Sequence, residues 1–254
     1  MRTVVIIPAR MGSSRFPGKP LAKILDLPMI EHVRRRALLA EGIDAVVVAT
    51  CDEEIRRAVE SYGGTVVMTS PRHERCTDRI AEAAHDLEAD IVVNLQGDEP
   101  CVLPRAAGDV ARPLRERPDC LCSCLVYPVA TYEEMENPNY VKTVLSRSGS
   151  VLCFSRSVIP SRRKGESPPL YRQSGIMAYR REFLLEFASW PQTGLERAES
   201  VDMMRILEND RRIQAIVTPY FTPGVDVPAD VGVVEELIRG DAEQGRLYRQ
   251  ILGR

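Results

Sequence analysis

Three cationic side chains follow the first apolar run of the chain within one short loop. Residues 3–9 read TVVIIPA, and Arg10, Arg15 and Lys19 come after them with small residues between. A glycine-containing loop after a strand offers free backbone N–H groups to an anion. Cationic side chains can hold several phosphate oxygens and stabilise charge on a departing pyrophosphate. We therefore expect a triphosphate site rather than a solvated basic loop, formed by Ala9, Arg10, Gly12, Ser13, Arg15 and Lys19.

The same loop departs from two better-known phosphate loops. Five residues instead of four separate Gly12 from Gly18, and Pro20 stands where the Walker A loop has its magnesium-binding hydroxyl. The dinucleotide fingerprint G-x-G-x-x-G is also absent from this loop. The sequence therefore favours neither a P-loop kinase nor a dehydrogenase.

Two carboxylates follow apolar runs that are far apart in the sequence. Asp98 lies in NLQGDEP and Asp226 in PGVDVPAD. Mg²⁺ accepts one or two carboxylates and completes its shell with water and substrate phosphates, so we expect both aspartates to bind Mg²⁺. The alternative for Asp226 is an N-cap of the helix that follows, for which Asp230 is a poorer candidate. Glu99 is expected to make a structural contact.

The first half of the chain alternates apolar strand patterns with helical ones. Continuous β-branched runs indicate strands buried on both faces of a parallel sheet, and ligands of such sheets bind at the carboxyl ends of the strands. We expect an α/β, doubly wound, mostly parallel sheet in one domain, residues 1–254, with an inserted β-rich subdomain at about 100–185. The expected strands are 3–9, 44–50, 65–69 and 90–98, and the expected helices are 28–42, 53–63, 77–89 and 195–209.

Composition excludes several classes of protein. A net charge of −2 does not suit a nucleic-acid binder. No apolar stretch is long enough to span a membrane and the N-terminus lacks a signal-peptide pattern, so we expect a cytoplasmic protein. The seven cysteines form no C-x-x-C pair, which favours reduced, buried thiols over a zinc site.

The opening loop also resembles the signature of a known family. PARMGSSRFPGKPL is similar to the motif of the cytidylyltransferases that activate acidic sugars, above all the family of 3-deoxy-manno-octulosonate (Kdo) cytidylyltransferases, or CMP-Kdo synthetases. NLQGDEP, NPNYVKTV, FSRSVIP, GIMAYRREFL and GVDVPAD extend the resemblance along the chain. It implies a nucleotide-diphospho-sugar transferase-like fold, a homodimer, and transfer of CMP from CTP to an anionic acceptor with release of pyrophosphate. The expected catalytic residues are Arg10, Lys19, Asp98 and Asp226.

The resemblance also identifies residues that contact the nucleotide. HERCTDR, residues 73–79, matches a family segment at Thr77 and Arg79, and Gln96 matches the glutamine of Q-G-D-E-P. Arg75 and Cys76 replace a small Ser-Gly pair, which leaves a base other than cytosine open. Thr77 has the alternative role of a helix N-cap. A regulatory protein that binds nucleotide without turnover is a further alternative, which the retained Lys19 and aspartates disfavour.

The acceptor side departs from the family pattern. RQSGIMAY has Gln173 and Met177 where the family has histidine and tyrosine, and Asp202 and Met203 replace glutamate and glutamine. Each sugar hydroxyl left unpaired costs about 1–3 kcal/mol, so we expect a small phosphonate such as phosphonoformate, with Kdo or a related sugar acid as the alternative. Basic residues supply charge for a small anion unless they form a solvated loop: Arg156, Arg162, Arg163, Lys164 and Arg172. The expected acceptor-binding set is Arg156, Arg172, Gln173, Met177, Asp202 and Met203.

Overall fold

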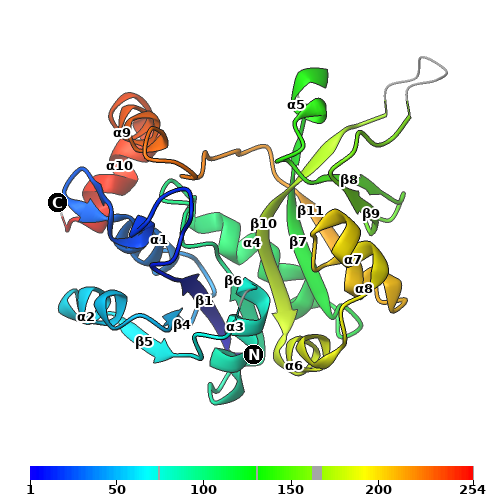
Figure 1. Cartoon of the computed structure of the whole chain (residues 1–254), viewed down its shortest axis with the longest axis horizontal. Helices are drawn as coiled ribbons and strands as arrows, with labels where there is room; N and C mark the ends of the chain where they lie inside the picture. The colour runs from blue at the N-terminus through cyan, green and yellow to red at the C-terminus, as the bar shows by residue number, and fades with distance from the viewer. Residues whose placement is uncertain (74, 130, 162–167, 254) are drawn as a thin grey trace. The chain divides into compact units, whose positions relative to one another are not determined.

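The computed structural model describes residues 1–73, 75–129, 131–161 and 168–253 (Figure 1). The chain forms two compact units. The first unit contains Met1–Gly108 and Thr222–Arg254, and the second unit contains Asp109–Phe221. The second unit thus continues beyond the expected end of the insertion near residue 185. It includes the segment that was expected to be a single helix at 195–209.

A parallel sheet forms the centre of the first unit. Its strands lie in the order β6 (Ile91–Asn94), β1 (Thr3–Ala9), β4 (Ala45–Thr50) and β5 (Thr65–Met68). Every residue of β1 and β6 is buried, as continuous apolar strands in a covered parallel sheet require. Because the strands are parallel, Ala9 lies beside Thr50 at their carboxyl ends.

The C-terminal helices of the first unit pack against its N-terminal segment. The C-terminal helices, drawn in red, pack beside the blue N-terminal segment in Figure 1. A buried cluster joins the two segments through Ile24, Met29, Cys101, Val225 and Val234. The helices with residues in this unit are α1 (Met29–Ala37), α2 (Glu53–Ser61), α3 (Cys76–His85), α4 (Pro104–Glu116), which runs on into the second unit, α9 (Asp230–Gly240) and α10 (Ala242–Ile251), with the 3₁₀ turn η1 (Lys19–Leu21) and the short strands β2 (Lys23–Ile24) and β3 (Leu27–Pro28).

The second unit contains mixed strands. Strand β7 (Cys122–Pro128) lies between antiparallel β10 (Tyr171–Arg180) and parallel β11 (Gln214–Val217). Strands β8 (Lys142–Leu145) and β9 (Val151–Ser155) form an antiparallel pair, and β8 also pairs with β10. The remaining helices are α5 (Tyr132–Glu136), α6 (Arg181–Ser189), α7 (Gly194–Glu199) and α8 (Met204–Glu208).

The expected helix at 195–209 was wrong as a single element. It is broken into α7 and α8 at Ser200, which has the left-handed φ of 53°. Arg205 of α8 forms a buried ion pair with Glu196 of α7, with its Nη2 2.8 Å from Glu196 Oε1. This pair explains why the two short helices pack together instead of continuing as one.

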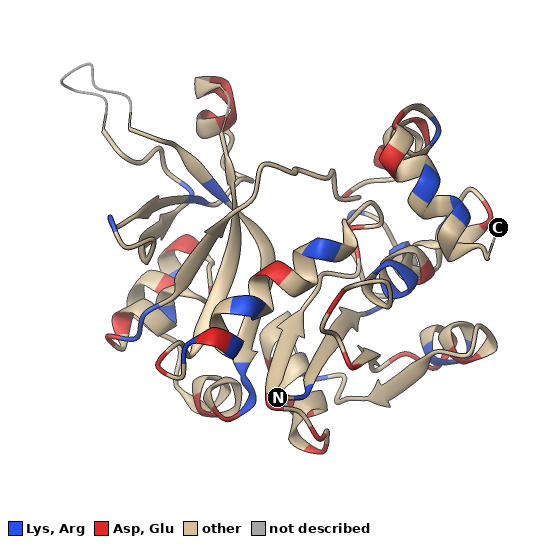
Figure 2. Ribbon diagram, turned by 180° about the vertical axis from the view of Figure 1, so that it is seen from behind, with Lys and Arg blue, Asp and Glu red and all other residues tan. Residues whose placement is uncertain are grey.

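The surface carries both signs of charge. Figure 2 shows basic and acidic residues interspersed along the helices and loops of the chain, in keeping with the net charge of −2. Among the residues that the structure describes, no helix combines the length and the apolar character that a membrane span requires.

Candidate functional site

The opening loop folds around the peptide group of Met11. The backbone N–H groups of Ser13 and Gly18 both donate to the Met11 carbonyl oxygen, at 2.9 and 3.1 Å. Gly18 has φ 73°, a conformation that favours glycine, and it turns the chain into η1. Arg10 and Arg15 are left exposed. The loop therefore stands at the carboxyl end of β1, where parallel sheets bind ligands.

Lys19 and Asp98 form an ion pair at this edge. Lys19 Nζ lies 2.6 Å from Asp98 Oδ2 and 3.0 Å from the carbonyl oxygen of Val225. The two side chains are 15% and 35% exposed, so both remain accessible to a ligand. The structure brings together a predicted phosphate-binding cation and a predicted metal-binding carboxylate.

Asp226 lies on the segment that packs against Asp98. The backbone N–H of Val225 donates to the Asp98 carbonyl oxygen at 2.9 Å. The Asp226 carboxylate accepts a hydrogen bond from Arg15 Nη2 at 2.9 Å, and this pair is more than half exposed. The two aspartates thus sit on adjacent backbone segments, each with a cation of the opening loop as its partner.

Two carboxylates suit Mg²⁺ only when other oxygens complete its shell. Among the described residues, no group of three or more histidine, cysteine or acidic side chains lies close enough to hold a metal ion. Asp98 and Asp226 match a Mg²⁺ site of the kind that takes one or two protein carboxylates together with phosphate oxygens and water. The chemistry of this donor set therefore fits the predicted metal.

The helix after Asp226 has Ala229 in its N-cap position and no side-chain capping hydrogen bond among the described residues. Helix α9 begins at Asp230, whose Oδ2 accepts the backbone N–H groups of Asp226 and Val227 at 2.7 and 2.9 Å. The N-cap alternative for Asp226 was wrong, because Ala229 has the N-cap position. Asp230 lies inside the helix, as expected, and is not its N-cap. Asp230 orders the turn, which leaves the Asp226 carboxylate to Arg15.

The loop after β6 approaches β1 closely. A Cβ atom on Gly97 would lie 2.9 Å from the carbonyl oxygen of Pro8, so only glycine fits there without a shift. Glu99 is buried, and burial together with Asp98 raises its pKa well above the usual value. Its Oε2 has no hydrogen-bond partner in the described part of the chain. The structural contact expected of Glu99 is therefore not made through that oxygen.

The segment expected to contact the nucleotide is held by its own side chains. Arg79 is buried, and its Nη1 donates to Thr69 Oγ1. Glu82 accepts the Ser70 N–H at 2.9 Å and also contacts His73. Burial raises the pKa of Glu82, but these two hydrogen bonds and the charges of His73 and Arg79 outweigh it, so that the pKa is lowered. The sequence interpretation missed this role of Glu82, because His73 lies in the loop before α3 and no local pattern connects the two residues.

Gln96 follows the carboxyl end of β6, and Thr77 lies at the start of α3. Helix α3 begins at Cys76 with Arg75 in the cap position, so Thr77 is inside the first turn and is not the N-cap. Gln96 is half-buried and donates to Asn94 Oδ1 at 3.1 Å. Their contacts with a nucleotide stay a prediction.

Arg156 in the second unit binds backbone carbonyl groups. Its guanidinium donates to the carbonyl oxygens of Glu199 at 2.8 Å, Pro138 at 3.0 Å and Ser200 at 3.5 Å. Its backbone N–H donates to Glu199 Oε2 at 2.7 Å. Arg156 therefore fastens the end of α7 to the loop before β8, a role that the sequence did not indicate.

Arg172 lies in an aromatic cluster. It is 5% exposed, and its guanidinium carbon lies 3.9 Å from the ring centre of Phe221, 4.2 Å from Tyr140 and 5.9 Å from Tyr127. No carboxylate of the described residues forms an ion pair with it. The rings stabilise the cation through their negative faces, so Arg172 has a structural role in the second unit.

The substituted positions of β10 and the α7–α8 turn differ in burial. Met177 is 1% exposed, and its sulfur accepts the hydroxyl of Tyr179 at 3.1 Å. Gln173, Asp202 and Met203 are half-buried. Arg162, Arg163 and Lys164 lie outside the described residues.

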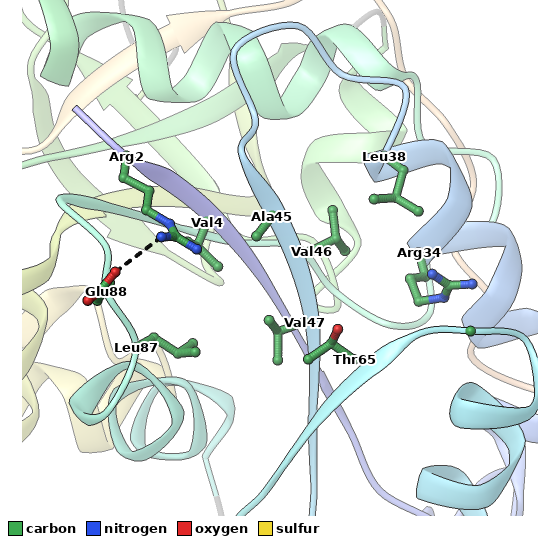
Figure 3. A pocket seen from close by; sticks show the side chains of 11 residues that line it. Arg2, Val4, Arg34, Leu38, Ala45, Val46, Val47, Thr65, Leu87 and Glu88 are labelled. Carbon is green, nitrogen blue, oxygen red and sulfur yellow. Dashed lines mark hydrogen bonds and ion pairs between the residues drawn. The ribbon is translucent and has the colours of Figure 1, made fainter.

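A cavity of about 380 Å³ lies at the opposite end of the first unit's strands. Figure 3 shows Val4, Ala45 and Val47 on its floor, with Arg2 and Arg34 at its two ends. Arg2 pairs with Glu88, and Arg34 makes two hydrogen bonds to Glu31. The two arginines that line the cavity are therefore already paired with carboxylates. Arg10 and Asp98 are not among the residues that line this cavity.

Comparisons with known proteins agree with the sequence resemblance. A family model described as "Cytidylyltransferase" matches residues 4–213. The 3-deoxy-manno-octulosonate cytidylyltransferases of Syntrophus aciditrophicus and Chlorobium limicola are 42% and 43% identical, and each match covers 95% of this chain and 99% of the relative.

Solved structures match as well. A CMP:2-keto-3-deoxy-manno-octonic acid synthetase complexed with CTP superposes with a TM-score of 0.91 at 39% identity, covering 94% of this chain and 99% of that one. A cytidylyltransferase from Leptospira borgpetersenii superposes at 0.66 with 17% identity, covering 100% and 93%; this likeness extends to the fold alone.

Proposed function

The chain belongs to the cytidylyltransferase family, and we propose that it transfers CMP from CTP to 3-deoxy-manno-octulosonate with release of pyrophosphate. Cytidylyl transfer from CTP is the reaction of its family, and the acceptor is the proposed part. The observation that carries the acceptor is the full-length match, above 40% identity, to relatives named for this sugar acid.

On the donor side, the residues of the opening loop hold the triphosphate. Arg10, Arg15 and Lys19 supply fixed positive charge for the phosphate oxygens. Lys19 and Arg10 stabilise the charge that develops on the leaving pyrophosphate, which is where preorganised cations have their largest effect. The acceptor oxygen attacks the α-phosphorus, so most of the catalysis comes from positioning and charge stabilisation.

Asp98 and Asp226 would hold Mg²⁺. The ion, when bound, would supply charge neutralisation and a template for the α-phosphate and the acceptor oxygen. Lys19 and Arg15 are the ion-pair partners of these same carboxylates. A triphosphate that takes over the two cations leaves both aspartates free for the metal, which supports binding of nucleotide and metal together.

The relatives do not support the phosphonate that the sequence led us to expect. That expectation used Arg156 and Arg172 as anion-binding residues, and both are engaged within the second unit. It also used the apolar Met177, which is buried and contacts Tyr179. Among the described residues, the case for a smaller acceptor therefore depends on Gln173, Asp202 and Met203.

We expect the active protein to be a homodimer, as the family resemblance implies. Among the described residues, β9 pairs only with β8, and its Leu152 is 61% exposed. This apolar side chain on an edge strand is a candidate contact for a second copy of the chain. Light scattering coupled to size exclusion measures the mass in solution, and a monomer would contradict this part of the proposal. A cytoplasmic location also stays a prediction.

A pyrophosphate-release screen tests the proposed reaction. It crosses CTP, UTP, ATP and GTP with Kdo, a sialic acid and phosphonoformate, with magnesium present. We expect release with CTP and Kdo to exceed every other combination by at least tenfold in kcat/KM. Preferred turnover with phosphonoformate would overturn the acceptor, and equal turnover with UTP would overturn the choice of base.

A further inference from the structure

Asp52 occupies the junction between β4 and α2, at the same edge of the sheet as the opening loop. It has the N-cap position of α2, with extended backbone at φ −105° and ψ 120°. Its carboxylate makes no capping hydrogen bond to the described residues of this helix. The side chain turns instead to the opening loop, where Oδ2 accepts the backbone N–H of Met11 at 2.8 Å.

Met11 is the residue around which the opening loop is folded. Its carbonyl oxygen accepts two N–H groups from within the loop, those of Ser13 and Gly18. Its own N–H leaves the loop and ends on Asp52. Both backbone polar groups of Met11 are thus hydrogen-bonded: its carbonyl oxygen to N–H groups of the loop, and its N–H to the Asp52 carboxylate.

The backbone of Asp52 is itself fixed. Its N–H donates to Thr50 Oγ1 at 3.1 Å, and Thr50 is fully buried at the end of β4. Thr50 lies beside Ala9 in the parallel register. Asp52 therefore connects the end of β4 to Met11, the residue that follows Arg10.

The charge of Asp52 is unfavourable for a triphosphate nearby. A carboxylate beside an anion site repels the ligand, so any benefit to nucleotide binding has to come from geometry. A hydrogen bond from an N–H to a carboxylate is stronger than one to a neutral acceptor, which suits a loop that must keep its shape while exposed to water.

We propose that Asp52 is a positioning residue for CTP binding, which fixes the Met11 peptide and thereby Arg10 and the N–H groups of the loop. This inference rests on the proposed triphosphate role of the loop. It assigns to Asp52 no contact with the nucleotide.

The test compares Asp52 variants by calorimetric titration with CTP, which needs no acceptor. Asp52→Ala removes the acceptor of the Met11 N–H, and we expect the Kd for CTP to rise about tenfold to a hundredfold. Asp52→Asn keeps an acceptor oxygen in place, and we expect it to recover most of the affinity. Asp52→Glu keeps the charge but displaces the oxygen, and we expect it to bind CTP more weakly than Asp52→Asn.

Asp241→Ala is the matched control. Asp241 is the N-cap of α10 in the same unit, and its Oδ1 accepts the N–H of Gln244 at 2.8 Å. We expect this variant to lose thermal stability while the Kd for CTP changes by less than about twofold. The KM for the acceptor should stay unchanged in the Asp52 variants, which a general loss of structure would not allow.

Each outcome has one meaning. Asp52→Ala that binds CTP within about twofold of the wild type overturns the inference alone. Asp52→Glu that binds as well as the wild type shows that charge rather than geometry matters, and it also overturns the inference. An equal loss in Asp241→Ala attributes the effect to stability. A wild-type chain that binds no CTP overturns both the inference and the proposed function.

Discussion

The predicted site residues of the two units are used differently. In the first unit, Lys19 and Arg15 pair with Asp98 and Asp226, and the pairs are accessible at the ends of strands. In the second unit, Arg156 binds backbone carbonyl groups and Arg172 is enclosed by aromatic rings. Charged residues of the same type thus form accessible ion pairs in one unit and internal structural contacts in the other, and only their surroundings distinguish them.

The largest expected effect tests whether the second unit depends on its internal charges. Glu196→Gln leaves Arg205 buried without its ion partner, which costs about 3–5 kcal/mol of unfolding free energy. Chemical denaturation measures this change. Glu243→Gln breaks the partly exposed pair with Arg105 and serves as the control, with an expected loss below about 1 kcal/mol. Equal effects of the two variants would contradict the assignment.

The next effect tests the chemical role of the first unit. Lys19→Met removes the cation that we propose to stabilise the leaving pyrophosphate, and we expect kcat/KM to fall by about 10²–10³. The matched control is Lys23→Met, because Lys23 is exposed and lies in the same segment. Pyrophosphate release measures both variants. A fall of similar size in Lys23→Met would indicate a general effect of charge on nucleotide binding.

The first unit also contains a buried group that titrates. Burial lowers the pKa of His32 to about 4, and the charges of Arg36 and Arg35 add to this, while a hydrogen bond to Ile24 and the charge of Asp26 oppose it. The folded pKa is below the unfolded value of about 6.5. The contribution of His32 to the free energy of unfolding is therefore fully present above pH 6.5 and is lost as the pH falls toward 4.

The difference of about 2.5 in pKa corresponds to about 3.5 kcal/mol at about 1.4 kcal/mol per pKa unit. Denaturation between pH 4 and 7 measures this loss, and His32→Gln should remove most of the slope. If the slope stays unchanged in that variant, other groups account for the acid sensitivity of the first unit.

The smallest effect separates a structural arginine from a ligand-binding one. Arg172→Lys keeps the charge but loses the planar group that stacks on Phe221 and Tyr140, so we expect a loss of about 1–2 kcal/mol in stability. The KM for the acceptor should stay within about twofold. An unchanged stability with a raised KM would return Arg172 to the acceptor site.

The sequence predicted the parts of the fold that depend on local patterns. Continuous β-branched runs located β1, β4 and β5. The approach of Asp98 to the Asp226 segment was also anticipated, because both aspartates follow apolar runs expected to end at one edge of the sheet.

The sequence did not reveal roles that arise from long-range packing. Phe221 and Tyr140 are far from Arg172 in the chain, so their cluster has no local signal. The break at Ser200 places an ordinary residue in the left-handed region, which residue type alone does not predict. The partner of Asp52 is likewise a backbone N–H in a distant loop.

Phosphorus NMR of the reaction mixture tests the central claim most directly. With CTP, Kdo and magnesium, we predict a new phosphodiester resonance from CMP-Kdo and one pyrophosphate for each product molecule formed. The Lys19→Met variant should produce neither at a comparable rate. Conversion of CTP without a Kdo-dependent phosphodiester, or no consumption of CTP by the wild type, would contradict the account.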